Sequence, residues 1–148
     1  MGYLSMGIFD ETEDLLQRAL ALLKRQVEES QYASLKKLVI AFYGYQHLKS
    51  LQRLTPEKAA EGLLKIWAFL QERPPQTPKY EVSYWKPETS SGSSSERIVI
   101  KIINDNMPFL VASLTHLLNR LGLKPKFVLH PILSVHRDAI GRLLSIEA

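Results

Sequence analysis

The stretch Arg97–Asn104, RIVIKIIN, decides how this 148-residue chain is expected to fold. Nearly every position of Ile98–Ile103 is apolar and β-branched, which is typical of a strand buried on both faces. We therefore expect this strand to lie at the centre of a sheet. Beyond the turn Asn104–Phe109, leucines recur every three or four residues as far as Leu121. This spacing predicts an amphipathic helix, one face of which covers the sheet.

Two further strands are predicted after this helix. Lys126–Arg137 alternates apolar and polar residues and contains Pro131, which cannot donate to a ladder, so we expect an edge strand. Asp138–Gly141 has turn chemistry and Arg142–Ile146 is again apolar, so the two strands should form a hairpin. Together with the first strand they predict three-quarters of a ferredoxin-like β-α-β-β unit, incomplete at its carboxyl end.

A fourth strand is predicted upstream, because Lys79–Trp85 alternates with a period of two. We expect it to pair antiparallel with Arg97–Asn104, which gives the strand order 79–85, 97–104, 142–147, 126–135. Thr89–Ser95 contains no apolar residue and is expected to be a loop that links the first two of these strands.

The first half of the chain predicts helices. Apolar stripes extend from the acidic start Asp10–Asp14 to about residue 28, and again over Tyr32–Phe42. Thr55 and Pro56 are start signals for a third helix to about residue 73, and the prolines of 74–78 end it. The fold class is therefore α+β, with a helical region at residues 1–75 and a ferredoxin-like region at 76–148.

Composition sets limits on function. The net charge of +4 is not gathered into a basic patch, so nucleic acid is not expected as a partner. The longest apolar run, Leu38–Tyr45, is too short to cross a bilayer. The chain has no cysteine, which excludes disulfides and thiol chemistry. We expect a soluble cytoplasmic protein.

Several motifs occur in the order and at the spacing of one known family. They are IINDNMPFLV at Ile102–Val111, LLNRLGL at Leu117–Leu123, HPIL at His130–Leu133, LKIWAFLQER at Leu64–Arg73 and PKYEV at Pro78–Val82. With these motifs, roughly residues 35 to 144 closely resemble the amino-terminal segment of the very large NAD-specific glutamate dehydrogenases. The resemblance extends to ACT domains, small regulatory modules that often bind amino acids at a strand-to-helix turn.

That turn holds the candidate effector-binding residues. They are Asn104, Asp105, Asn106, Met107, Pro108 and Phe109. Asn106 or Asp105 can cap the helix and Pro108 suits its first turn, so free backbone N–H groups could hold a carboxylate. ACT domains usually have glycine after the proline, whereas a bulky Phe109 here would fill the space of a ligand. A structural cap and a ligand site both remain open.

No catalytic, metal-binding or NAD-binding motif is present. The seven glycines form neither G-x-G-x-x-G nor a P-loop, and no nucleophile elbow occurs. His130 and His136 would stand roughly 20 Å apart along a strand, too far to chelate one metal.

The resemblance implies that the parent enzyme converts glutamate to 2-oxoglutarate with NAD, using residues in a distant carboxy-terminal part. It implies a regulatory or architectural segment that contacts the rest of the parent chain, in an enzyme that is a homo-oligomer. An amino-acid sensor is the first alternative. An RNA-binding module is the second, although basic residues are not interleaved with exposed aromatics as stacking requires.

Overall fold

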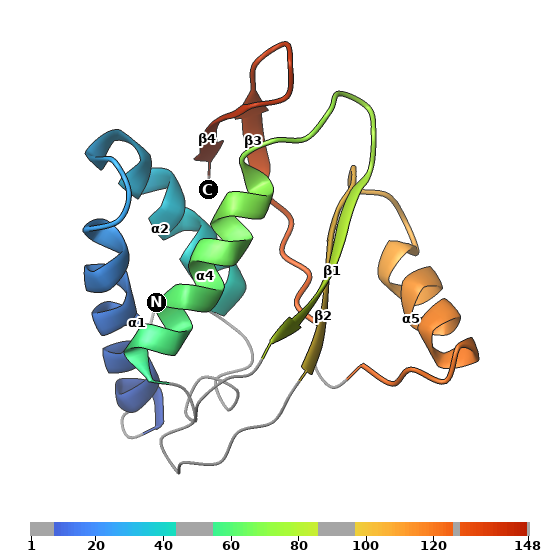
Figure 1. The fold of residues 1–148 in the computed structure, drawn as a ribbon, viewed down its shortest axis with the longest axis horizontal. Helices are drawn as coiled ribbons and strands as arrows, with labels where there is room; N and C mark the ends of the chain where they lie inside the picture. Colours follow the sequence, from blue (N-terminus) through green and yellow to red (C-terminus); the bar gives the residue numbers. More distant parts are fainter. Residues whose placement is uncertain (1–7, 44–54, 86–96, 126–127, 148) are drawn as a thin grey trace.

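In a computed structural model, the structure describes residues 8–43, 55–85, 97–125 and 128–147. The elements in chain order are α1 (Ile8–Lys24), α2 (Glu29–Tyr43), α4 (Pro56–Leu70), β1 (Lys79–Trp85), β2 (Arg97–Ile103), α5 (Leu110–Arg120), β3 (Ser134–Arg137) and β4 (Leu143–Glu147). The helices α1, α2 and α4 lie together, and the β1–β2 hairpin stands between α4 and α5 (Figure 1). The predicted α+β class is confirmed. The predicted loop Thr89–Ser95 lies outside the described residues.

The helix start at Thr55 follows the sequence signals. Thr55 Oγ1 accepts a hydrogen bond from Lys58 N at 3.2 Å, and Pro56 occupies the first helical position, where its missing N–H costs nothing. The helix α4 ends at Leu70, three residues earlier than predicted, and α1 ends at Lys24 rather than near residue 28. None of the helices that the structure describes is long and apolar enough to cross a bilayer.

The core lies where helices α1, α2 and α4 meet β4. Its buried residues are Ala19, Leu20, Leu23, Leu35, Leu38, Val39, Ala59, Ala60, Leu63, Trp67, Leu70 and Ile146. Tyr32 and Phe42 are partly buried and pack against this cluster. Ile146 is 1% exposed, and its N–H donates to Ser34 Oγ on α2 at 3.0 Å. The last strand is therefore part of the helical core.

Both predicted hairpins are present, but the predicted single sheet is wrong. β1 pairs antiparallel with β2, and β3 pairs antiparallel with β4. The described strands form two separate two-stranded sheets, so β4 is not the neighbour of β2. The physical reason is burial, because Ile146 on β4 is almost fully buried in the core between the helices. β3 is shorter than the predicted strand Lys126–Arg137. Residues 128–133, which include Pro131, precede it and are not in a strand.

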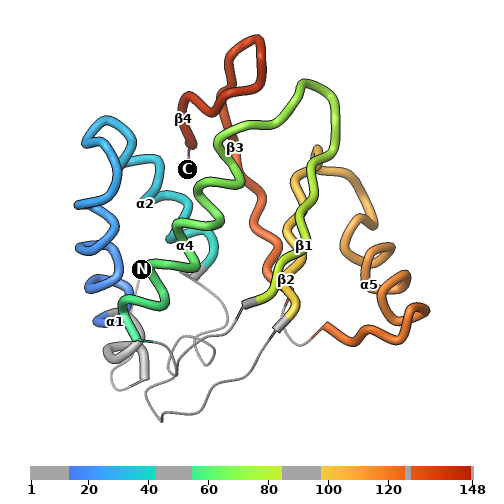
Figure 2. Tube along the Cα trace, viewed as in Figure 1, coloured from blue at the N-terminus to red at the C-terminus, as the bar shows by residue number. Residues whose placement is uncertain are grey.

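The prediction that Ile98–Ile103 is buried on both faces is also wrong. Ile98, Ile100 and Ile102 are 55%, 40% and 41% exposed. Only the opposite face of β2 approaches the core, through Ile103. α5 lies over the exposed face (Figures 1 and 2), yet none of its residues is buried. This helix covers the hairpin incompletely.

Cations from both sheets close the carbonyl end of α4. Lys79 Nζ donates to Phe69 O and Glu72 O, each at 2.7 Å, and lies 4.7 Å from the centre of the Phe69 ring. Arg137 Nη1 donates to Leu70 O at 2.8 Å and to Gly141 O at 3.0 Å. Burial, together with the nearby charge of Arg73, lowers the pKa of Arg137. A helix end with unpaired carbonyls is stabilised by such positive charges.

The turn between β3 and β4 comes equally close to α4. Gly141 O accepts from Arg73 N at 2.9 Å, and Leu143 N donates to Gln71 O at 2.8 Å. Gly141 has φ 96°, and a Cβ placed there would lie 1.8 Å from Arg73 O. Only glycine fits this contact between two backbones.

Replacing Arg137 by methionine should lower the free energy of unfolding by about 1–3 kcal/mol, because it leaves Leu70 O without its side-chain donor and removes one of the two donors to Gly141 O. The exposed Arg142→Met is the matched control and should stay within about 0.5 kcal/mol of the parent. Urea unfolding monitored by circular dichroism measures both. Equal losses in the two variants would contradict the capping role of Arg137.

Two glycine substitutions should distinguish the cost of a clash with neighbouring backbone from the cost of a positive φ. Gly141→Ala adds a clash with backbone to the cost of its positive φ, so we expect a loss of at least about 3 kcal/mol. Gly122 has φ 79° with nothing within 4 Å of an added Cβ, and Gly122→Ala should cost only about 1 kcal/mol. Thermal unfolding of the two variants provides the comparison, and similar losses would rule out a close approach at Gly141.

Candidate functional site

The turn between β2 and α5 starts the helix without a side-chain cap. The N-cap residue is Phe109, with φ 63° and ψ 10°, and its side chain makes no capping hydrogen bond. The prediction that Asn106 or Asp105 caps the helix is wrong, and Pro108 lies before the helix rather than in its first turn. The physical reason is that the side chains of Asn104 and Asp105 bond to groups other than the first amides of α5. Asn104 Oδ1 accepts from Asp105 N at 2.9 Å, so it serves the turn itself.

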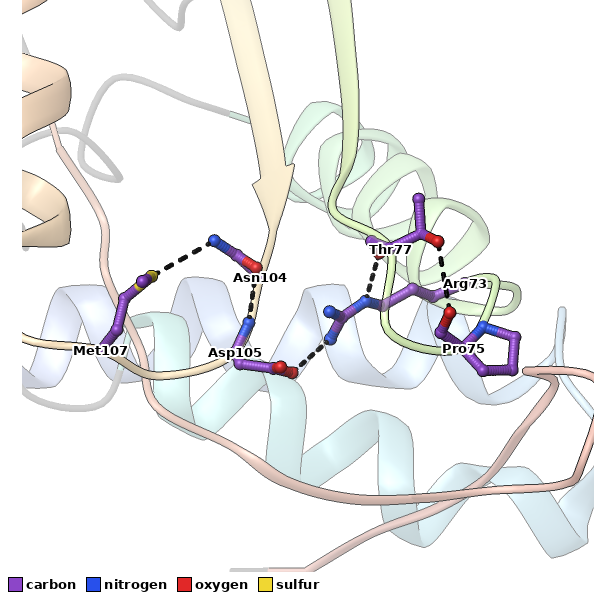
Figure 3. A network of polar contacts seen from close by, with 6 residues as sticks. All are labelled: Arg73, Pro75, Thr77, Asn104, Asp105 and Met107. Atoms are coloured by element: carbon purple, nitrogen blue, oxygen red, sulfur yellow. Dashed lines mark hydrogen bonds and ion pairs between the residues drawn. The ribbon is translucent and has the colours of Figure 1, made fainter.

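Arg73 anchors this turn to the end of α4 (Figure 3). Arg73 Nη1 lies 3.0 Å from Asp105 Oδ1, and Arg73 Nε donates to Thr77 O at 2.7 Å. Thr77 Oγ1 donates in turn to Pro75 O at 3.2 Å. The side chain of Arg73 is 13% exposed and that of Asp105 is 79% exposed. Because water reaches the carboxylate, the ion pair contributes at most about 1 kcal/mol and mainly positions the turn.

The remaining residues of the turn face solvent. Asn106 and Pro108 are exposed, and Met107 is 50% exposed, with its Sδ 3.6 Å from Asn104 Nδ2. Phe109 is 81% exposed. Its bulky ring therefore lies in solvent.

Opposite charges flank this turn. The first amides of α5 carry the partial positive charge of a helix start and have no side-chain acceptor. The carboxylate of Asp105 is accessible a few residues before them. A carboxylate near the helix start and an ammonium near Asp105 are the groups that such an arrangement can hold. Sequence reasoning missed Arg73, because nothing in the local pattern links it to a partner 32 residues away.

Other features of the described residues lie apart from the turn. A shallow groove of about 420 Å³ runs between α1 and α4, lined mainly by Leu22, Ala60, Leu64 and Ala68. His136 Nε2 lies 3.0 Å from Glu147 Oε1 across the β3–β4 hairpin. Among the described residues, no three histidine or carboxylate side chains come together as a metal site would require.

Phe109 offers a direct test of backbone strain at this turn. A non-glycine residue at positive φ costs roughly 1–2 kcal/mol, and this exposed ring has little packing to lose. Phe109→Gly should therefore raise the free energy of unfolding by about 1 kcal/mol. Phe109→Ala removes the ring but keeps Cβ, so it should give no such gain. Chemical denaturation measures both, and a loss of stability in the glycine variant would show that the ring does pack.

The sequence of this chain is similar to that of known proteins over most of its length. The family described as the glutamate dehydrogenase ACT1 domain matches residues 38–148. An NAD-specific glutamate dehydrogenase of Halomonas elongata is 28% identical over 136 residues, which are 91% of this chain and 8% of that protein. The chain thus spans less than a tenth of the relative's length. No solved structure matches it. Because the family match covers most of the residues, this chain belongs to the glutamate dehydrogenase ACT1 domain family.

Proposed function

We propose that this chain is an amino-terminal regulatory or architectural segment of a much longer NAD-specific glutamate dehydrogenase. The observation that carries this proposal is the difference in coverage between the two proteins. The match covers 91% of this chain but only 8% of the relative. In this proposal the whole protein oxidises glutamate to 2-oxoglutarate and ammonium, with reduction of NAD. The protein is cytoplasmic and homo-oligomeric, and this segment contacts the rest of its own chain.

The residues present do not suit NAD binding within this segment. A dinucleotide pyrophosphate needs a glycine-rich turn that lets the backbone approach it at a helix start. The turn between β2 and α5 contains no glycine, and Phe109 occupies the position before the helix. We therefore place the cofactor and the catalytic residues elsewhere in the longer protein.

The helical region at 1–75 and the ACT-like region at 76–148 form one structural unit in this proposal. The burial of Ile146 among helices α2 and α4 supports this, as do the contacts of Lys79 and Arg137 with the end of α4. An architectural segment has to be rigid to transmit position, and a shared core supplies that rigidity.

An amino-acid effector at the turn Asn104–Phe109 is the second candidate. In this proposal the first amides of α5 hold its α-carboxylate, and Asp105 accepts its α-ammonium. The uncapped helix start and the 79% exposure of the Asp105 side chain support the idea. RNA binding has less support. Tyr80 and Tyr84 are exposed on one face of the hairpin, but the lysines of its described side chains lie on the other face.

The isolated 148-residue chain should show no glutamate-dependent reduction of NAD, because it lacks the catalytic residues. Absorbance of NADH measures this directly, with an intact glutamate dehydrogenase as the positive control. Formation of NADH by the isolated chain would overturn the assignment.

Calorimetry against a panel of amino acids tests the effector site. If an amino acid binds, Asp105→Asn should weaken binding at least about tenfold, since it removes the partner of the ammonium. Asp14→Asn changes an exposed carboxylate on α1 in the same way and should leave binding unchanged. Absence of heat with every amino acid would exclude the effector site and leave the architectural role in place.

A further inference from the structure

The edge of the β1–β2 hairpin that β1 forms is open among the described residues. β1 pairs with β2 over seven residues in an unbroken register, and no other described strand pairs with β1. It contains neither a proline nor a bulge, two of the devices that protect such an edge. A regular, unpaired edge offers a row of backbone donors and acceptors to another strand.

Several side chains of β1 are largely exposed to solvent. Tyr80, Val82 and Tyr84 are 77%, 60% and 70% exposed, more than their partners Ile102, Ile100 and Ile98 on β2. All six residues lie on one face of the hairpin, opposite the face from which Ile103 packs against the core. The exposure is thus greatest along the open edge, and a single short helix leaves that edge uncovered (Figure 2).

The order of residues in β1 suits pairing with a second copy of the same strand. The strand reads KYEVSYW, and Tyr80 and Tyr84 lie symmetrically on either side of Val82. If a second copy pairs antiparallel and centred on this residue, Val82 faces its own equivalent and Tyr80 faces Tyr84 of the other copy. Aromatic and β-branched side chains paired in this way stabilise a sheet. The symmetry is that of an isologous twofold interface, in which both copies use the same surface.

We propose that β1 is a self-complementary edge through which two copies of this chain form a continuous four-stranded antiparallel sheet. This inference goes further than the proposed homo-oligomer by naming its surface. It does not depend on the effector site or on the dehydrogenase activity.

Charges on the other face of the strand permit this register. Glu81 would face Ser83 of the second copy, and Lys79 would face Trp85, so no like charges meet. Within each copy, Lys101 Nζ lies 2.9 Å from Glu81 Oε2, and this hydrogen bond lowers the pKa of Glu81. Lys79 is held by the carbonyls of α4. Neither lysine is left to repel the second copy.

The contact is small. Seven residues and three exposed side chains from each copy bury less than the roughly 800 Å² per partner of a standard interface. We therefore expect a weak dimer whose population rises with concentration, and which a longer protein could reinforce by further contacts.

Sedimentation equilibrium over a concentration series tests the proposal with charged variants. Val82→Lys would place two ammonium groups directly opposite each other at the twofold axis, and should weaken dimerisation at least about tenfold. Ile100→Lys puts the same charge on the same face, one strand away from the edge, and should leave dimerisation within about twofold. A chain that stays monomeric to about 1 mM would overturn the proposal. Equal loss in both variants would instead indicate docking by the whole face.

Cross-linking gives an independent readout, because the chain has no cysteine of its own. In Val82→Cys the two introduced residues would face each other with Cα atoms about 4.5–5.5 Å apart, within the range of a disulfide. In Ile100→Cys they would lie about 14 Å apart, three strand spacings, and should not cross-link. Non-reducing electrophoresis after mild oxidation separates the two. Equal yields, or no covalent dimer from Val82→Cys, would contradict pairing through β1.

Discussion

The carbonyl end of α4 is the constraint on which the rest of the structure depends. A helix leaves its last carbonyls without partners, and they carry partial negative charge. Lys79 approaches them from the first hairpin and Arg137 from the second. Since α4 is also packed into the core, these two cations fix both hairpins to one rigid element. The hairpins therefore take their positions from the helix, not from each other.

This constraint explains why the chain forms two small sheets. The backbone after α4 bonds to the backbone around Gly141, through Arg73 N and Gln71 O. That pairing directs β4 across the helices, where Ile146 becomes part of the core. A strand held there is not available to pair with β2. The result leaves both edges of the β1–β2 hairpin without a strand neighbour in the described residues.

The parts predicted well from the sequence are those determined by neighbours in the chain. The start of α4 at Thr55 and Pro56, the pairing of β1 with β2 and the turn at Asp138–Gly141 depend on local signals. The strand order depends on contacts between distant segments, which no local period reports. The run Ile98–Ile103 shows the limit, because composition indicates apolar faces without indicating what covers them. The cap of α5 was predicted wrongly for a related reason, since Asp105 has a distant partner in Arg73.

The same ion pair limits how strongly an event at the turn could reach the core. Arg73 joins Asp105 to the end of α4, so a ligand that competes for this carboxylate would release the guanidinium beside Arg137. A ligand shifts an equilibrium only by its differential affinity for two states. An exposed pair contributes at most about 1 kcal/mol, which corresponds to about a fivefold change. Strong regulation through this turn would therefore need a second contact besides the ion pair of Arg73 with Asp105.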